Sequence, residues 1–408
     1  MSRLRILGMI MAGGKGDRLF PLTKARSKPA VPFAGKHRII DFVLSNFINS
    51  AVYAVYLLVQ YKSQSLIEHS RSTWRWRIGG GLKDTFITAV PPQMRQGESW
   101  YQGTADAVYQ NINIIRDFQP DLIAVFGADH IYRMDLGQLV KFHMENRADV
   151  TIAALPVSLA AAGNFGIIEV DRAQRIVGFE EKPRNPKPMP ADPSRAYASM
   201  GNYLFETELL IEALQEDAAR ATEHDFGRTI IPELFTKRKV FAYDFLTNEV
   251  PGVKPYEERG YWRDVGTLSA YWQAHLDLLG PTPAFDLHNM QWPVLGRVYD
   301  GPPVRFIDGE ARDSFLGEGC RIEGGYITRS VLGNGVRVGR GAELEECVVM
   351  DYAEIGVGAK LKGVIVDRFN IIPEGLEIGT GSGSGEQRCF RDPSGLFVLE
   401  RGETRALT

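Results

Sequence analysis

The sequence predicts an α/β domain with a mostly parallel sheet, followed by a parallel β-helix. Apolar runs of strand length alternate with helical patterns as far as about residue 280, which is typical of parallel strands covered by helices. Beyond that point glycines become frequent and an aliphatic residue returns every six positions, as in a coil of stacked turns. A chain of 408 residues also exceeds one ordinary core. We expect domains at residues 1–280 and 313–408, joined by a proline-rich linker at 281–312.

The first predicted strand ends in a glycine-rich turn. Ile6–Ala12 is apolar almost throughout, which indicates a strand buried on both faces. The next four residues, Gly13-Gly14-Lys15-Gly16, allow the backbone to turn sharply and to bring its N–H groups close to a ligand. Arg18 and Lys28 follow on the same segment and could reach the phosphates of that ligand. The pattern lacks the ending of a P-loop and the third glycine of a dinucleotide fingerprint. A glycine turn without a ligand is the alternative.

A helix, a strand and a long irregular segment follow in order. Residues 38–50 carry apolar side chains at helical spacing, and residues 53–59 have the composition of a second buried strand. Residues 74–94 are expected to be irregular because they contain Trp76, the run Gly79-Gly80-Gly81 and two adjacent prolines. A loop this long inside a compact domain is usually functional.

The stretch at residues 100–107 combines aromatic residues with the start of a helix. Thr104 is a suitable N-cap, and an apolar stripe follows it. Trp100 and Tyr101 could pack on a flat base while the first N–H groups of the helix face anionic oxygen. Judged on this stretch alone, such aromatic residues more often belong to the core.

Two aspartates stand at positions that suit a metal ion. Residues 122–126 predict a strand, and Asp129 follows near its carboxyl end, where ligands bind in open α/β sheets. Asp264 lies just before Gly266 and a predicted helix. Two carboxylates from distant parts of a chain commonly hold magnesium beside nucleotide phosphates. Taken singly, Asp129 would be a turn residue and Asp264 a helix N-terminal acid. We expect His130 to be structural.

Short strands separated by turns indicate antiparallel hairpins beyond residue 149. One of them ends in Glu181-Lys182-Pro183, where an acid, a base and a rigid loop could fix a sugar phosphate. The alternative for Lys182 is a solvated lysine at a strand end. The segment His224-Asp225-Phe226-Gly227 precedes an apolar stretch, and we interpret it as a turn at the start of a helix.

The composition argues against several classes of partner. With 47 basic and 50 acidic residues the net charge is −3, which gives no global attraction to nucleic acid or to an anionic membrane. No apolar run approaches membrane-spanning length, and the N-terminus lacks the pattern of a signal peptide. Cys320, Cys347 and Cys389 lie far apart without metal-ligand spacing. We expect them to be reduced, small apolar fillers in a cytoplasmic protein.

The last quarter of the chain carries the six-residue rhythm. Its aliphatic positions are Leu332, Val338 and Leu344 and, after a slip of one residue, Val349, Ile355 and Leu361. A small irregular β domain is the alternative. Coils of this kind in acyltransferases work with a histidine base, but no histidine follows His288. We therefore expect an oligomerisation and regulatory surface in place of a second enzyme.

Together, these motifs resemble those of the sugar-1-phosphate nucleotidyltransferase family. The matching segments are G-G-x-G-x-R-L with K-P-A-V, W-Y-x-G-T-A-D-A, G-A-D-H, E-K-P, A-S-M-G-N-Y, H-D-F-G and Y-W-R-D-V-G-T. The resemblance is close from about residue 7 to residue 279 and looser to about residue 398. It is greatest for members that act on ATP and glucose 1-phosphate. It implies a Rossmann-like nucleotidyltransferase domain followed by a left-handed parallel β-helix.

The resemblance also implies a role for each matching residue. Arg18, Lys28 and Asp129 would be catalytic. The nucleotide would be bound by Gly13, Gly14, Gly16, Tyr101, Gly103 and Thr104. Glucose 1-phosphate would be bound by Tyr101, Gly166, Glu181, Lys182 and Ser199. Asp129 and Asp264 would hold Mg²⁺, and Arg26 and Arg38 match basic positions of the family's effector site.

The activity that the resemblance implies is the formation of ADP-glucose and pyrophosphate from ATP and glucose 1-phosphate, for glycogen synthesis. It implies a homotetramer controlled by small-molecule effectors. Ala25 stands where many members have a cation, so we expect an effector different from fructose bisphosphate or a weaker response to it. Lys15 stands where arginine is frequent. Two alternatives to this activity are open. The enzyme could use another nucleotide or sugar phosphate, or the chain could be a regulatory subunit without catalytic activity.

Overall fold

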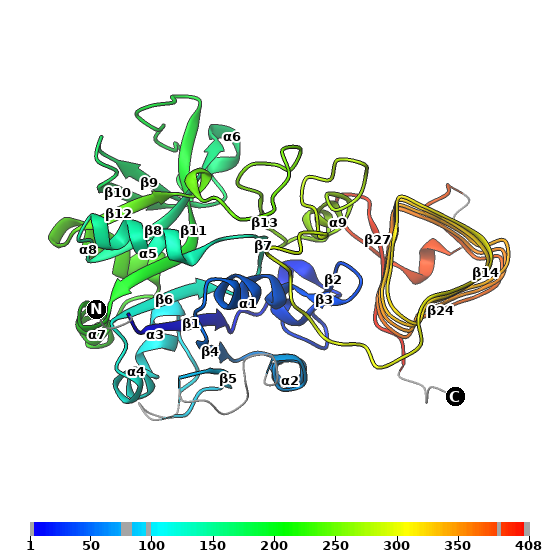
Figure 1. The fold of residues 1–408 in the computed structure, drawn as a ribbon, viewed down its shortest axis with the longest axis horizontal. Helices are drawn as coiled ribbons and strands as arrows, with labels where there is room; N and C mark the ends of the chain where they lie inside the picture. The colour runs from blue at the N-terminus through cyan, green and yellow to red at the C-terminus, as the bar shows by residue number, and fades with distance from the viewer. Residues whose placement is uncertain (1–3, 75–83, 95–98, 382–384, 404–408) are drawn as a thin grey trace.

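The computed structural model describes residues 4–74, 84–94, 99–381 and 385–403. A helix-covered sheet formed by the first part of the chain lies beside a coil of stacked triangular turns formed by the last part (Figure 1). The segments around β2 Pro32–Phe33, β3 His37–Arg38 and α1 Ile39–Asn49 lie between them (Figure 1). No helix among the described residues is both long and apolar enough to cross a membrane.

The sheet is parallel at its centre and antiparallel on one side, as the sequence predicts. Within the described residues its nine strands are β1 Ile6–Ala12, β4 Ala54–Val59, β5 Phe86–Val90, β6 Leu122–Gly127, β8 Val150–Ser158, β9 Gly166–Val170, β10 Ile176–Glu181, β11 Arg195–Glu206 and β12 Val240–Asp244. Strand β1 runs parallel to both β4 and β6, and β5 runs parallel to β4. Strand β11 runs antiparallel to β6 and β8, and the β9–β10 hairpin extends the sheet. Because β1 and β6 end at the same edge, the loops after them lie together.

Helices cover the sheet, and α1 shows how one of them is placed. The helices are α1 Ile39–Asn49, α2 Gln64–His69, α3 Thr104–Tyr109, α4 Ile112–Phe118, α5 Leu136–Glu145, α6 Leu159–Ala162, α7 Thr207–Ala218, α8 Ile231–Lys237 and α9 Leu268–Leu276. At the start of α1, Asp41 accepts a hydrogen bond of 2.8 Å from the backbone N–H of Arg38. The helix packs on β1 at Gly8, where an added Cβ atom would lie 2.6 Å from the ring of Phe47. A glycine is therefore needed in this strand for the helix to approach it.

The segment at residues 74–94 is less irregular than predicted. Its described part contains β5, which pairs with β4 at the edge of the sheet. The prediction failed because one short strand among tryptophans, glycines and prolines gives little periodic signal. Trp76 and the Gly79-Gly80-Gly81 run lie outside the described residues.

A two-stranded ribbon crosses the edge of the sheet where the site lies. Its strands are β7 His130–Tyr132 and β13 Trp262–Asp264, and they pair antiparallel. In their register Asp264 stands opposite His130. This pairing brings Asp264 beside Asp129, although the two residues are far apart in the sequence.

The C-terminal part is a parallel β-helix, which agrees with the six-residue rhythm. Its strands are β14 Arg305–Arg312, β15 Phe315–Leu316, β16 Arg321–Thr328, β17 Val331–Leu332, β18 Arg337–Val338, β19 Glu343–Glu345, β20 Val348–Val349, β21 Glu354–Ile355, β22 Lys360–Lys362, β23 Val364–Val366, β24 Ile371–Ile372, β25 Glu377–Ile378, β26 Phe390–Arg391 and β27 Phe397–Leu399. Equivalent aliphatic residues stack from turn to turn, as Leu332 does on Val349 and Val349 on Val366. Cys320 and Cys347 are buried in this coil, and all three cysteines are free, as expected. The linker bounds stay a prediction, and β14 begins at Arg305.

The coil packs directly against the loop that follows β1. Leu19, Leu22 and Val31 of this loop are fully buried. Their apolar cluster includes four side chains of the coil, Val348, Met350, Ile365 and Val398. The predicted phosphate-binding loop therefore depends on both parts of the chain for its position.

Candidate active site

A cavity of about 830 Å³ opens at the carboxyl edge of the sheet and collects most of the predicted site residues. Those that line it are Gly13, Gly14, Gly16, Arg18, Lys28, Tyr101, Gly103, Thr104, Asp129, Gly166, Glu181, Ser199 and Asp264. Lys182, Arg26 and Arg38 are not part of its lining. The loops after β1 and β6 thus face residues of the antiparallel half of the sheet across one space.

The glycine loop folds back so that Lys28 returns to its start. Gly16 has a φ of 69°, in the left-handed region that favours glycine. An added Cβ atom on Gly16 would lie 3.1 Å from the Cβ of Lys28 and 3.2 Å from the Thr23 side chain. The hydroxyl of Thr23 donates a hydrogen bond of 2.9 Å to the carbonyl of Gly16, which closes the loop. These contacts fix the backbone position from which the Lys28 side chain extends.

The ammonium group of Lys28 bridges the two aspartates. Its Nζ atom lies 2.8 Å from Asp129 Oδ2 and 2.8 Å from Asp264 Oδ1. Burial acts to lower the pKa of Lys28, but the two carboxylates outweigh it and raise that pKa above its ordinary value. Burial likewise acts to raise the pKa of Asp129, but Lys28, His130 and Arg18 hold it well below its usual range. Lys28 and Asp129 are therefore both charged at neutral pH.

The donor atoms around this bridge suit a divalent cation. One ligand atom each from Asp129, His130 and Asp264 can be chosen so that all three lie within 4.8 Å of one another. The carboxylates offer the oxygen ligands that magnesium prefers. His130 packs on Trp262, with 4.9 Å between the ring centroids, and its Nε2 atom lies 3.6 Å from Asp129 Oδ1. Its Nδ1 atom is buried with no hydrogen-bond partner in the described structure. The residues present fit a metal ion held mainly by two carboxylates.

Arg18 is an exposed cation of the site. Its side chain is 71% exposed, and its Nη2 atom lies 3.7 Å from Asp264 Oδ2. An added Cβ atom on Gly266 would lie only 2.8 Å from the same nitrogen. Gly266 therefore leaves the room in which the guanidinium group lies beside the carboxylate. A long, weakly held cation at the rim of a cavity can reach an anionic ligand inside it.

Tyr101 presents its ring to the cavity but not a free hydroxyl group. The hydroxyl oxygen accepts a hydrogen bond of 2.9 Å from Asn111 Nδ2. The backbone N–H of Tyr101 donates to Gln60 Oε1 at 2.7 Å, and its carbonyl accepts from Gln60 Nε2 at 3.2 Å. Burial raises the pKa of Tyr101. The residue is thus held as a neutral, flat wall.

The start of α3 differs from the expectation in two ways. The N-cap is Gly103, and Thr104 is the first helical residue. The backbone N–H groups of Ala105 and Asp106 donate to the carbonyl of His224, at 2.8 and 3.3 Å, and do not face the cavity with free donors. For the N–H groups of Ala105 and Asp106, the expectation that they would meet anionic oxygen of a ligand is therefore wrong. An added Cβ atom on Gly103 would lie 2.2 Å from that same carbonyl oxygen, so this close approach requires glycine.

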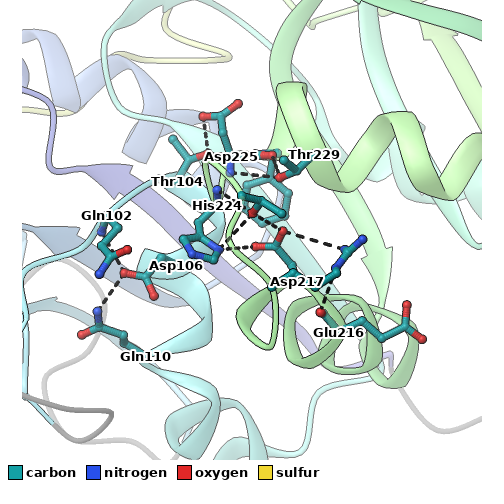
Figure 2. A network of polar contacts seen from close by, with 12 residues as sticks. Gln102, Thr104, Asp106, Gln110, Glu216, Asp217, His224, Asp225 and Thr229 are labelled. Atoms are coloured by element: carbon teal, nitrogen blue, oxygen red, sulfur yellow. Dashed lines mark hydrogen bonds and ion pairs between the residues drawn. The ribbon is translucent and has the colours of Figure 1, made fainter.

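A network of polar contacts joins α3 to the segment at residues 224–229 (Figure 2). The Thr104 hydroxyl donates to Asp225 Oδ2 at 2.9 Å. The other oxygen of Asp225 accepts from the N–H groups of Gly227 and Arg228, at 2.9 and 3.1 Å. His224 is held in turn by Asp217 at the end of α7, with 2.7 Å between Nδ1 and Oδ2. The prediction of a turn at the start of a helix is confirmed, because Asp225 caps the helical turn Phe226–Ile230.

The opposite wall of the cavity is built from β9, β10 and β11. Glu181 is half-buried there, and an added Cβ atom on Gly166 would lie 2.7 Å from its Oε2 atom. Ser199 lies on β11, and its Oγ atom accepts a hydrogen bond of 3.3 Å from the N–H of Gly201. Lys182 lies outside the lining, 57% exposed, with its Nζ atom 3.8 Å from Glu181 Oε1. In this structure the Lys182 ammonium group is at the rim.

Sequence reasoning missed several residues that line the cavity. They include Gln60, Phe179, Tyr203, Asp225, Phe226, Gly227 and Trp262. The sequence indicates a structural role for Asp225 to Gly227, and the structure shows that these residues also line the cavity. The sequence did contain a signal for a binding site at these positions, because a carboxylate, an aromatic ring and a glycine are adjacent at residues 225–227. The others are single apolar or amide residues, which no local pattern distinguishes from core.

Arg26 and Arg38 lie away from the cavity, towards the coil. The guanidinium group of Arg26 is paired with Asp367 of the coil. Arg38 donates to the carbonyl and the hydroxyl of Ser65, at 2.8 and 2.7 Å. Burial, together with the charges of Arg368 and Arg26, lowers the pKa of Arg38 to about 10. A second cavity, of about 360 Å³, lies between the loop and the coil and is lined by Arg26 but not by Arg38.

Comparisons with known proteins match both parts of the chain. A family model described as nucleotidyl transferase matches residues 7–280. A second, described as the GlmU-like C-terminal hexapeptide, matches residues 302–399.

Three similar proteins span nearly the whole chain. The glucose-1-phosphate adenylyltransferase of Thermodesulfovibrio yellowstonii is 52% identical over 398 residues, covering 97% of this chain and 96% of the relative. That of Anaeromyxobacter sp. strain Fw109-5 is 45% identical over 407 residues, covering 97% and 98%. Glucose-1-phosphate adenylyltransferase 1 of Vibrio parahaemolyticus is 44% identical over 403 residues, covering 97% and 98%.

Proposed function

This chain belongs to the nucleotidyl transferase family, among the glucose-1-phosphate adenylyltransferases, and we propose its reaction and the roles of its residues on that premise. The enzyme transfers AMP from ATP to glucose 1-phosphate, giving ADP-glucose and pyrophosphate, for glycogen synthesis. The observation that carries the site assignment is the bridge of Lys28 to Asp129 and Asp264 inside the cavity. It concentrates charge where two phosphate-bearing substrates would have to meet.

The reaction needs alignment and charge neutralisation more than proton transfer. The attacking phosphate oxygen of glucose 1-phosphate is already anionic at neutral pH, so no general base is required. It attacks the α-phosphorus of ATP in line, and pyrophosphate leaves. Arg18 can turn from Asp264 towards the developing charge, since its side chain is largely exposed. Loss of one such cation raises a barrier by about 3 kcal/mol.

We assign Mg²⁺ to Asp129 and Asp264. The two carboxylates face each other across Lys28 and provide oxygen donors. A bound magnesium ion supplies positive charge next to the phosphate oxygens. Lys28 adds a second positive charge from a buried position, and it helps to hold the pKa of Asp129 below its usual range. His130 supports the site by packing on Trp262.

The two walls of the cavity divide the substrates between them. The glycine loop at residues 13–16 and the ring of Tyr101 hold the nucleotide, with Gly103 and Thr104 below it. Gly166, Glu181 and Ser199 hold the hexose phosphate, and Tyr101 borders both halves. Lys182 lies at the rim, next to Glu181, which lines the cavity. A change in the conformation of its exposed side chain would bring the ammonium group to the sugar phosphate.

Regulation and assembly remain further parts of the proposal. We assign Arg26 and Arg38 to an anionic small-molecule effector from the family resemblance; of the two, Arg26 lines the 360 Å³ cavity between loop and coil, where it is paired with Asp367. The coil is the proposed surface of a homotetramer. Three free cysteines fit a cytoplasmic enzyme.

A substrate panel tests the proposed function. Pyrophosphate release is measured for ATP, dTTP, UTP and GTP, each with glucose, glucosamine and mannose 1-phosphates. We expect ATP with glucose 1-phosphate to give the highest kcat/KM by at least about tenfold. Preference for another pair would overturn the substrate assignment. Absence of turnover with every pair, with anion binding retained, would support a silent regulatory subunit.

A further inference from the structure

The segment between Arg18 and Lys28 leaves the active site, contacts the coil and returns. On the way Phe20 packs edge-on against Phe390 of the coil, with 5.6 Å between the ring centroids. Lys24 forms a half-exposed ion pair with Glu400. The segment then reaches Arg26, two residues before Lys28. Both ends of the segment carry catalytic cations, while its middle rests on the other part of the chain.

The contact nearest to Lys28 is a buried ion pair between the two parts of the chain. Arg26 Nη2 donates to both oxygens of Asp367, at 2.7 and 2.8 Å. The side chains are only 6% and 1% exposed. Charge-assisted hydrogen bonds in such a setting are short and directional, and water cannot replace either partner because both side chains are buried. The pair therefore fixes where Arg26 can lie.

Asp367 is itself rigidly placed at the end of β23. One of its oxygens accepts from the backbone N–H of Arg368 at 2.7 Å. Its backbone N–H donates to Leu399 of β27 at 3.1 Å, and its carbonyl accepts from Asn370 Nδ2 at 2.8 Å. The carboxylate is thus a fixed point of the coil, and Arg26 adapts to it.

The path from Arg26 to Lys28 is short and stiff. Ser27 is fully buried and extended, with φ −72° and ψ 155°. Pro29 follows Lys28 and restricts its backbone conformation. Lys28 must still place one nitrogen 2.8 Å from two carboxylates at once. A displacement of Arg26 therefore passes to Lys28 with little room to be absorbed.

We propose that Asp367 is a positioning residue for the reaction, which acts through Arg26 to hold Lys28 between Asp129 and Asp264. The proposal rests on the proposed function of this site. It makes one residue of the coil part of the catalytic apparatus, although it lies outside the cavity. Lys24 and Glu400 provide a matched comparison, since they join the same loop to the same coil without burial.

The test measures kcat and both KM values for Asp367→Asn, for Asp367→Glu and for the control Glu400→Gln. Each change is also made in a Lys28→Ala background, with radiolabelled ATP to follow slow turnover. We expect Asp367→Asn to lower kcat by about 10- to 100-fold, the range for a misplacement near 1 Å. Asp367→Glu should recover part of the loss, and Glu400→Gln should stay within about twofold of the unmodified enzyme.

The Lys28→Ala background separates positioning from general stability. If Asp367 acts through Lys28, Asp367→Asn causes no further loss of kcat there. A loss of the same factor in both backgrounds would overturn the proposal, as would a kcat for Asp367→Asn within about twofold of the unmodified enzyme. If Asp367→Asn does not fold, Arg26→Lys keeps the charge, loses the guanidinium geometry and is judged by the same criteria. Inactivity of the unmodified enzyme would count against the proposed function. The coupling between Asp367 and Lys28 is judged separately, from the ratio of the rates with and without Asp367→Asn in each background.

Discussion

Replacing Lys28 with methionine should weaken catalysis and strengthen metal binding at the same time. Methionine keeps much of the length of the side chain but removes the charge. In the native site one ammonium group serves two carboxylates, each with an oxygen 2.8 Å from its nitrogen. A divalent ion bound by both carboxylates has to compete with that ammonium group. Without it, the ion meets two uncompensated negative charges.

The magnitude follows from the distances. The two carboxylate oxygens are at most about 5.6 Å apart, because each lies 2.8 Å from the same nitrogen. At an effective dielectric constant near 20, two unit charges at about that separation repel by roughly 3 kcal/mol. Relief of half this repulsion would tighten ion binding by about tenfold. Loss of the cation from the transition state should lower kcat by about 10²- to 10³-fold.

Electron paramagnetic resonance of free Mn²⁺, in a titration without nucleotide, measures the affinity directly. Pyrophosphate release gives kcat on the same preparations, and thermal unfolding shows that the variant is folded. Lys182→Met is the matched control, since that lysine lies at the rim beside Glu181. It should leave the affinity for Mn²⁺ unchanged. Unchanged or weaker Mn²⁺ binding by Lys28→Met would refute the reasoning, because Lys28 would then not share the carboxylates with the ion.

Three further predictions concern the carboxylates, the helix contact and the pH dependence. Asp129→Asn should abolish magnesium-dependent turnover with the fold intact by circular dichroism, and near-normal activity would contradict its role. Gly103→Ala should cost roughly 1–3 kcal/mol in urea unfolding and raise the KM for ATP, because the new methyl group would meet the His224 carbonyl. Burial lowers the pKa of His275 from 6.5 to about 4. Between these two pH values His275 is therefore protonated in the unfolded chain and neutral in the folded chain. The free energy of unfolding should therefore fall by up to about 3 kcal/mol per such histidine between pH 6.5 and pH 4, and His275→Gln should flatten this slope.

Elements with strong local patterns were predictable from the sequence. The first strand was predicted with its observed bounds, Ile6–Ala12, because every residue in it is apolar or small. The predicted strand at residues 53–59 begins one residue later, at Ala54. The coil was predicted because its rhythm repeats over many turns. Strand β5 was missed, since five residues at a sheet edge carry too little pattern.

The site was predictable as a set of residues but not as a set of contacts. Motifs placed Asp129, Asp264 and Lys28 together, and the structure brings their side chains into one cavity. Nothing local to Lys28 shows that its ammonium group bridges both carboxylates, because that depends on pairing between distant segments. Thr104 is a residue type that favours the N-cap position, but the N-cap is Gly103, and the carbonyl of His224 accepts from the N–H groups of the second and third helical residues. Long-range packing decided each of these details.

The register of the ribbon of β7 and β13 sets how the carboxylates of Asp129 and Asp264 lie relative to each other. Neighbouring residues on a strand point to opposite faces, so a slip of one position would turn Asp264 away from Asp129. Loops that lead into the ribbon can therefore vary in length, whereas a single inserted residue inside either short strand should separate the two carboxylates and lower activity. In related proteins, insertions and deletions should therefore occur in the loops outside these two strands and not within them.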